Sequence, residues 1–153
     1  MDQIPEYFCN FPFKPNEKRP CVINDESAIK FIYTENMPES SDLNWVFVST
    51  ENLTFAKYQL APGSTFDPVD VHSGDEIYYI LEGTVTMLNA KLGQVVDVNQ
   101  NEAVLLPKGA PHKAYNFTNK KALILYVIAP KIWEKDGPPM NYTGEMKLFK
   151  FNY

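Results

Sequence analysis

The sequence predicts one all-β domain, a sandwich or barrel built of short strands. From residue 45 onward, short runs rich in β-branched and aromatic residues follow one another closely, separated by Gly, Pro or Asn turns. No segment of helical length shows a sustained 3.6-residue apolar period with capping residues. The chain has 153 residues, 44% apolar and 14% aromatic, which suits one domain with a sizeable core and argues against disorder.

The chain divides into three expected parts. Residues 1–44 form a Pro-rich arm that contains one short strand and ends in a polar linker. Residues 45–130 form the barrel, and residues 131–153 form a C-terminal extension expected to pack on its surface. Strands are expected at 28–34 in the arm and, in the barrel, at 45–49, 53–60, 65–72, 76–81, 84–89, 94–98, 103–106, 112–117 and 122–129.

Turn-forming residues set the ends of these strands. The arm strand reads Ala-Ile-Lys-Phe-Ile-Tyr-Thr, a run of β-formers that follows a Pro-rich stretch. Gly, Pro and Asn supply the backbone conformations that turns need. Short strands at this spacing favour a sandwich or barrel over βαβ units. Turns are expected at 61–63, 73–75, 82–83, 92–93, 99–101, 107–109 and 119–121.

The charge distribution excludes two classes of partner. The net charge is −5, and no Lys/Arg cluster exceeds the pair at 120–121, so the basic patch that nucleic acid or an anionic membrane requires is missing. The longest apolar stretch, 122–130, is far shorter than a membrane span. The first residues lack the basic start and apolar run of a secretory signal, so a cytoplasmic protein is expected.

The two histidines of the chain lie in segments that carry other reactive side chains. Asp70 and His72 share one face of an expected strand because alternate residues of a strand point to the same side. The turn at 73–75 then folds the chain back, so Glu76 can lie beside His72, and Tyr78 follows on the face of Glu76.

The second histidine, His112, opens a strand after a Pro107-Lys-Gly109 turn. Asn116 lies on the same strand face as His112, and we expect it to contact substrate. Lys57 and Gln59 share one face of the 53–60 strand. Two orientations are open for that face: inward, where Lys57 would anchor a carboxylate or phosphate and Gln59 would contact substrate, or outward into solvent.

The first of these segments resembles the first sequence motif of the cupin superfamily. That motif has a Gly, a His-x-His pair, a Glu and a second Gly, and this chain offers Gly63, His72, Glu76 and Gly83. Asp70 stands where the family has its first histidine, and the spacing from Gly63 is one residue longer than usual.

The second segment resembles the second cupin motif, in which a Gly precedes Pro-x-Gly, His and Asn. Here Pro107, Gly109, His112 and Asn116 match, and Asn101 replaces the opening Gly. This replacement is mild because Asn also tolerates the left-handed backbone region.

The resemblance implies a double-stranded β-helix, a jelly-roll that closes into a barrel. It also implies that His72, Glu76 and His112 hold one divalent metal ion inside this barrel. Asp70 occupies the fourth ligand position, and three roles stay open for it: an oxygen ligand, a hydrogen-bond partner of substrate or metal-bound water, or neither. Two imidazoles and a carboxylate with open positions are the donor set of non-haem Fe(II) oxygenases. The added carboxylate favours Fe(II) or Mn(II), while Ni(II), Zn(II) and Cu(II) can compete by affinity.

The implied function is that of a metal-dependent enzyme acting on a small organic molecule, with a dioxygenase favoured. A second hypothesis is a non-oxidative isomerase, lyase or decarboxylase, in which the ion polarises a carbonyl while Asp70, Tyr78 or Lys57 moves a proton. A third is a non-catalytic ligand-binding cupin, with or without the metal. The resemblance also implies a homodimer that uses 28–34 or 45–49.

Overall fold

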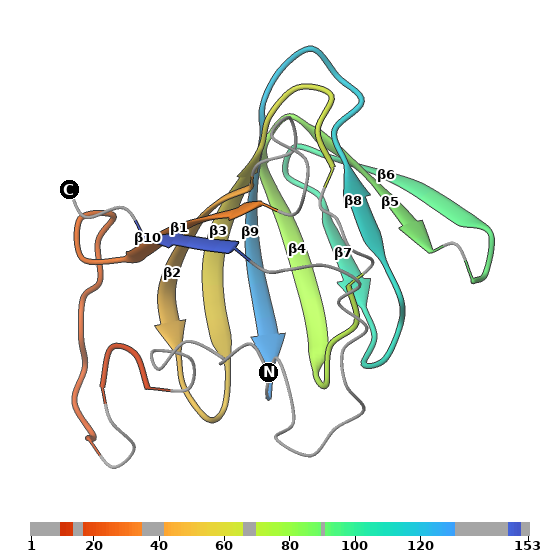
Figure 1. Ribbon diagram of the computed structural model, residues 1–153. Coiled ribbons are helices and arrows are strands. Elements are labelled where there is room, and N and C mark those ends of the chain that lie inside the picture. Colours follow the sequence, from red (N-terminus) through yellow and green to blue (C-terminus); the bar gives the residue numbers. More distant parts are fainter. Residues whose placement is uncertain are drawn as a thin grey trace.

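The computed structural model describes residues 10–13, 17–34, 42–65, 70–89, 91–130 and 147–150. These residues form strands and turns, with no helix among them (Figure 1). Nor does this described part contain a helix that could cross a membrane. The strands are β1 (Ile29–Thr34), β2 (Asp42–Ser49), β3 (Thr54–Leu60), β4 (Asp75–Glu82), β5 (Thr84–Asn89), β6 (Gln94–Asn99), β7 (Ala103–Leu106), β8 (Lys113–Tyr115), β9 (Ala122–Ala129) and β10 (Lys147–Lys150).

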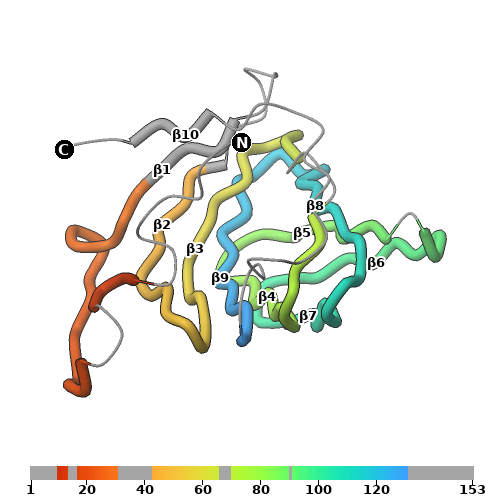
Figure 2. Tube along the Cα trace, turned by 60° about the horizontal axis from the view of Figure 1, so that its bottom comes forward, coloured from red at the N-terminus to blue at the C-terminus, as the bar shows by residue number. Residues whose placement is uncertain are grey.

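The strands form two antiparallel sheets that curl around a common interior. The larger sheet has the order β10-β1-β2-β3-β9-β4-β7, and the smaller has the order β6-β5-β8. Figure 2 shows how β3, β9 and β4 curve toward β5, β6 and β8 on the far side of the barrel. The predicted all-β jelly-roll architecture is confirmed.

Alternation of side chains along the central strands builds the core. Every second residue of β3 and of β9 is buried, as expected for strands with one face against the interior. Leu60, Ile80 and Ile124 are fully buried at the centre of the hydrophobic cluster. Burial of a side chain of this size contributes about 1.5–3 kcal/mol to folding.

Most expected strands lie within a few residues of their predicted bounds, and the differences have physical reasons. The segment 65–72 is not a continuous strand: Thr65 and Asp70 each form a single bridge, and 66–69 lie outside the described residues. The polar linker ends before the expected residue 44, because Asp42 already pairs with Leu60 in the adjacent strand. The extension 131–153 contains β10, which pairs with β1, and its other residues lie outside the described part.

Gly83 links β4 to β5 in a position where a side chain does not fit. Its φ is +81°, and a Cβ there would lie 2.6 Å from the Lys121 carbonyl oxygen and 3.1 Å from Ala122 Cα. Gly83→Ala should therefore lower the free energy of unfolding by about 3 kcal/mol, measured by urea denaturation. Gly93→Ala is the control, because Gly93 has a similar φ of +63° with no atom within 4 Å of the added Cβ. Equal losses in both variants would contradict the close approach of Lys121.

Candidate metal centre

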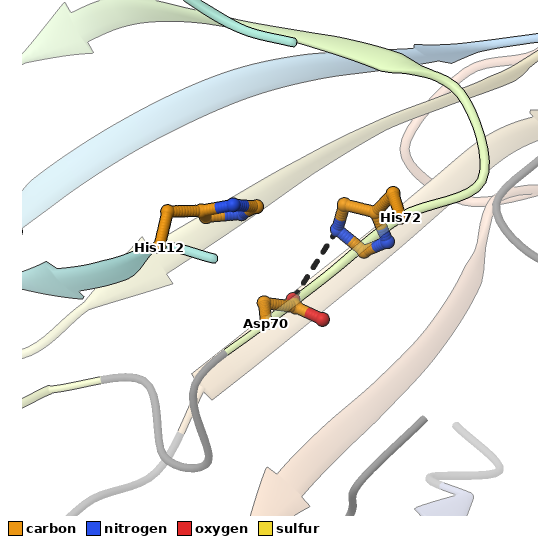
Figure 3. Close-up of side chains that lie close together, drawn as sticks. All are labelled: Asp70, His72 and His112. Carbon is orange, nitrogen blue, oxygen red and sulfur yellow. Dashed lines mark ion pairs between the residues drawn. The ribbon is translucent and has the colours of Figure 1, made fainter. Parts of the chain in front are cut away.

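Backbone hydrogen bonds bring the two histidine segments together. The Asp70 N–H donates to the His112 carbonyl oxygen at 2.8 Å, and the His112 N–H donates to the Asp70 carbonyl oxygen at 3.0 Å. The Gly109 N–H donates to the His72 carbonyl oxygen at 3.0 Å. Because these bonds are made by the main chain, the folded backbone alone holds Asp70, His72 and His112 next to one another (Figure 3).

Four buried side chains converge at this point. Potential ligand atoms of Asp70, His72 and His112 all lie within 4.8 Å of one another. Glu76, the second residue of β4, places Oε2 at 3.2 Å from His72 Nε2 and at 3.0 Å from His112 Nε2. Asp70 Oδ2 lies 3.3 Å from His72 Nε2. The cluster therefore contains two imidazoles and two carboxylates, with all four residues buried.

Several of these buried atoms lack a hydrogen-bond partner. Asp70 Oδ1, Glu76 Oε2 and His112 Nε2 are buried, and none has a partner in hydrogen-bonding geometry, although Glu76 Oε2 and His112 Nε2 are close. An unsatisfied buried polar group costs about 1–3 kcal/mol, and native proteins avoid it. A divalent cation bound among the oxygens and imidazole nitrogens would satisfy such atoms, so the donor set fits a metal ion.

The tautomer of His112 also suits a metal ligand. Its Nδ1 lies 2.9 Å from the Ala110 carbonyl oxygen, which can only accept a hydrogen bond. Nδ1 therefore carries the proton, and the lone pair of a neutral imidazole resides on Nε2, the atom that faces Glu76. An imidazole ligand whose other nitrogen donates to a carbonyl is the usual arrangement in metal sites.

The carboxylates control the protonation of the cluster. Burial opposes charge on His72, but the Asp70 and Glu76 carboxylates outweigh it and raise the pKa of His72 well above its ordinary value. Burial likewise opposes charge on His112, and Glu76 more than offsets it, so its pKa is raised. Burial would raise the pKa of Asp70, but the neighbouring His72 lowers it. Without a metal, the imidazoles hold protons that an incoming cation must displace.

Metal affinity should therefore rise with pH. Protonated imidazoles do not bind cations, and both histidine pKa values lie above the ordinary value of 6.5. These raised pKa values stabilise the metal-free fold most below the unfolded-state pKa, and that contribution is lost as pH rises through the folded-state values. Mn(II) titrations between about pH 6 and pH 9 should show tighter binding and proton release at each step. An affinity independent of pH would contradict this linkage.

Tyr78 lies beside the cluster, as expected for a residue two positions after Glu76 on the same face of β4. The Tyr78 ring meets the His112 ring edge-on, with centroids 6.2 Å apart and an interplanar angle of 87°. Burial, followed by the nearby Glu76 carboxylate, raises the pKa of Tyr78 well above its ordinary value. Its hydroxyl is therefore protonated and can donate a hydrogen bond. Its catalytic role stays a prediction.

The inward orientation considered for Lys57 and Gln59 is wrong. The face of β3 that is buried in the core carries the alternate residues, such as Tyr58, so Lys57 and Gln59 lie on the outer face. Lys57 Nζ lies 3.1 Å from the Asp25 carboxylate and 4.7 Å from the centroid of the Trp45 ring. These outer contacts account for the lysine without a substrate.

The structure also corrects the substrate contact expected of Asn116. Its side chain is fully buried, and Nδ2 donates to the carbonyl oxygens of Leu60, Ala61 and Lys120 at 2.7–3.2 Å. Its Oδ1 accepts from the backbone N–H and the hydroxyl of Thr118 at 3.1 and 2.8 Å. The amide group therefore joins two turns by hydrogen bonds, and its role is structural.

Sequence reasoning missed the polar residues beside Tyr78. Tyr58 and Tyr126 face the interior from β3 and β9, and Asn44 faces it from β2. Strict alternation in β3 and β9 assigns each tyrosine to one face of its strand, but it does not say which face meets the core. Their meeting with Tyr78 depends on the strand order, which local patterns do not contain.

Comparison with known proteins identifies the class. A family model for the cupin domain matches residues 56–128. The TT1209 protein from Thermus thermophilus is 31% identical over 64% of this chain and 90% of its own, with a TM-score of 0.54. The chain belongs to the cupin superfamily. No curated protein matches it.

Two further solved structures share the fold. A predicted oxalate decarboxylase from Thermotoga maritima is 23% identical, covers 72% of this chain and 99% of its own, and has a TM-score of 0.60. The polyketide cyclase RemF from Streptomyces resistomycificus is 14% identical, covers 77% of this chain and 89% of its own, and has a TM-score of 0.58. At these identities the likeness concerns the fold alone.

Proposed function

We propose that this cupin is a metal-dependent enzyme that acts on a small organic molecule by Fe(II)-type dioxygenase chemistry. The observation that carries the proposal is the convergence of His72, Glu76, His112 and Asp70 in one buried cluster with unsatisfied polar atoms. Two histidines and one carboxylate with open positions are the ligands of non-haem Fe(II) oxygenases. The second carboxylate supports Fe(II) or Mn(II) over softer ions.

In this proposal, His72, Glu76 and His112 hold the ion, and Asp70 either adds an oxygen ligand or contacts the substrate. When bound, the ion supplies Lewis-acid and redox chemistry. The chain supplies the rest. The Ala110 carbonyl orients the His112 ring, and the Tyr78 hydroxyl can donate a hydrogen bond to a substrate oxygen. Burial of the cluster limits access of bulk water.

A second candidate is a non-oxidative isomerase, lyase or decarboxylase. The observation that favours it is the Asp70 carboxylate, whose Oδ1 has no hydrogen-bond partner while Oδ2 lies 3.3 Å from His72 Nε2. A buried carboxylate with a free oxygen can accept a proton from a substrate carbon or hydroxyl. In this case the metal polarises the substrate and does not change oxidation state.

Parallel assays with different metals and gases separate the candidates. Oxygen uptake with catechols, keto acids or thiols in the presence of Fe(II) and ascorbate would support the dioxygenase. Turnover under anaerobic conditions with Mn(II), Zn(II) or Ni(II) would support the second candidate. Tight small-molecule binding without turnover in either condition would overturn both and leave a ligand-binding cupin. His72→Ala serves as the inactive control, and Lys57→Ala, on the outer face, as the active one.

Asp70→Asn should separate a ligand role from a role in proton transfer. The amide keeps the volume and removes the negative charge, so we expect metal affinity to fall by less than about tenfold and the rate by about 100-fold or more. Steady-state kinetics at saturating metal, with metal affinity measured separately, checks this. Unchanged kinetics would show that the Asp70 carboxylate takes no part in the reaction.

The proposal also includes a homodimer, formed through 28–34 or 45–49, and a cytoplasmic location. In the structure these two segments lie in the neighbouring strands β1 and β2. Sedimentation equilibrium of the full chain would establish the number of copies, and a monomer at micromolar concentration would contradict the dimer.

A further inference from the structure

Three tyrosines and an asparagine line the inner wall of the barrel beside the metal centre. Asn44, Tyr58, Tyr126 and Tyr78 come from β2, β3, β9 and β4, which are consecutive in the larger sheet. We call these four residues the tyrosine wall. The centroid of the Tyr58 ring lies 5.6 Å from that of Tyr78 and 5.7 Å from that of Tyr126. The Tyr126 hydroxyl donates to Asn44 Oδ1 at 3.5 Å.

The tyrosine wall is continuous with the metal centre. Tyr78 packs edge-on against His112, so the wall begins at a proposed metal ligand. The three tyrosines retain 4–9% of their surface, whereas Leu60, Ile80 and Ile124 of the same sheet retain none. The tyrosines therefore keep slightly more accessible surface than these aliphatic side chains of the same core cluster.

The two carboxylates of this interior need an equal positive charge, which either protonated imidazoles or a divalent metal ion supplies. Asp70 and Glu76 contribute two carboxylates, and among the residues whose burial the structure describes, no lysine or arginine is buried. Lys57, the lysine that the sequence offered as an anchor, lies on the outer face and pairs with Asp25. One divalent ion with two neutral imidazoles brings the formal charge of the centre to zero. A dianionic substrate would bring it to −2, and within the described part of the chain no buried lysine or arginine would offset that charge.

We propose that the site takes a neutral small molecule that presents adjacent hydroxyl and carbonyl oxygens to the metal, and that it rejects dicarboxylates. The tyrosine wall recognises further hydroxyl groups of this substrate through its uncharged phenol and amide groups. This inference rests on the proposed function, because it assumes that a divalent ion occupies the centre. The proposed function does not specify the substrate, and this inference adds its chemical class.

Three small chelators of increasing charge test the charge selection. Dihydroxyacetone is neutral, glycolate is a monoanion and oxalate is a dianion, and each offers two oxygens on adjacent carbons. Displacement of water from the Mn(II)-loaded protein, followed by water-proton relaxation, gives the affinity of each probe, and free Mn(II) gives the reference. The quantity to compare is the ratio of the oxalate affinity to the dihydroxyacetone affinity. We expect this ratio to be at least about 100-fold smaller for protein-bound Mn(II) than for free Mn(II). An oxalate preference equal to that of the free ion would overturn the inference.

Single-hydroxyl deletions test the wall itself. Tyr58→Phe and Tyr126→Phe should each weaken dihydroxyacetone binding about fivefold, while Mn(II) affinity stays unchanged. Tyr79→Phe is the control, because Tyr79 lies on β4 but faces outward and is 38% exposed. Unchanged dihydroxyacetone binding in both variants would show that the tyrosines only pack in the core, and it would overturn their proposed role in substrate recognition.

The same experiment distinguishes failure of the inference from failure of the proposed function. If the protein does not enhance the relaxation by Mn(II) before any probe is added, the metal centre itself is refuted, and the inference falls with it. If the enhancement is present, but the charge of the probe and the tyrosine substitutions have no effect on probe binding, the metal centre stands and only the substrate class is wrong.

Discussion

His72→Ala and His112→Ala are each expected to abolish stoichiometric metal binding. Each removes an imidazole from a cluster in which both Nε2 atoms lie within 3.2 Å of Glu76 Oε2. Loss of a residue that only supports a metal ligand already costs about 10–100-fold in affinity, and loss of a ligand itself should exceed 100-fold. Elemental analysis of each purified variant, with Mn(II) titration, measures the effect.

Backbone bonds should keep both variants folded. The segments are joined through the main-chain groups of Asp70, His72, Gly109 and His112, none of which the alanine substitutions remove. Far-UV circular dichroism should therefore stay close to that of the wild type. Lys113→Ala, which alters the residue next to His112, is the control and should retain full metal content. Stoichiometric metal in either histidine variant would contradict the ligand assignment.

Asn116→Ala is expected to cause the largest loss of stability. It leaves the carbonyl oxygens of Leu60, Ala61 and Lys120 without their shared donor, and it removes the acceptor used by Thr118. At about 1 kcal/mol or more for each lost buried bond, the free energy of unfolding should fall by about 3–4 kcal/mol. Urea denaturation followed by fluorescence measures this change.

An exposed neighbour provides the matched control for Asn116. Asn119→Ala lies in the same turn region at an exposed position and should change stability by less than about 0.5 kcal/mol. If Asn116→Ala were equally mild but raised the KM for substrate, the residue would return to the substrate-binding role expected from sequence. We expect the opposite: a large stability loss with metal affinity per folded molecule unchanged.

Local patterns in the sequence were sufficient for much of the barrel. The strands β5, β7 and β9 have their predicted bounds because turn residues flank each run of β-formers. The left-handed backbone expected at Asn101 is present, with a φ of 67°. β10 was missed because it is held by pairing with β1, more than a hundred residues earlier in the chain, and no local pattern records such a partner.

The candidate site, like the fold, was predictable from the sequence only in part. The expected alternation and one turn grouped Asp70, His72 and Glu76, although 65–72 is not a continuous strand. The family resemblance added His112. The orientation of Lys57 could not be read locally, because alternation assigns two faces but does not say which one meets the core. The Ala110 carbonyl that fixes the His112 tautomer is a main-chain group, which side-chain patterns do not reveal.

Imidazole NMR tests the central claim most directly, since the chain has only two histidines. Proton–nitrogen correlation spectra of the nitrogen-15-labelled protein resolve both rings during titration with diamagnetic Zn(II). The account predicts that His72 and His112 shift together, that both changes are complete at one equivalent, and that His112 binds through Nε2 while Nδ1 keeps its proton. Separate titration of the two rings, or no change in either, would contradict a single ion held between them.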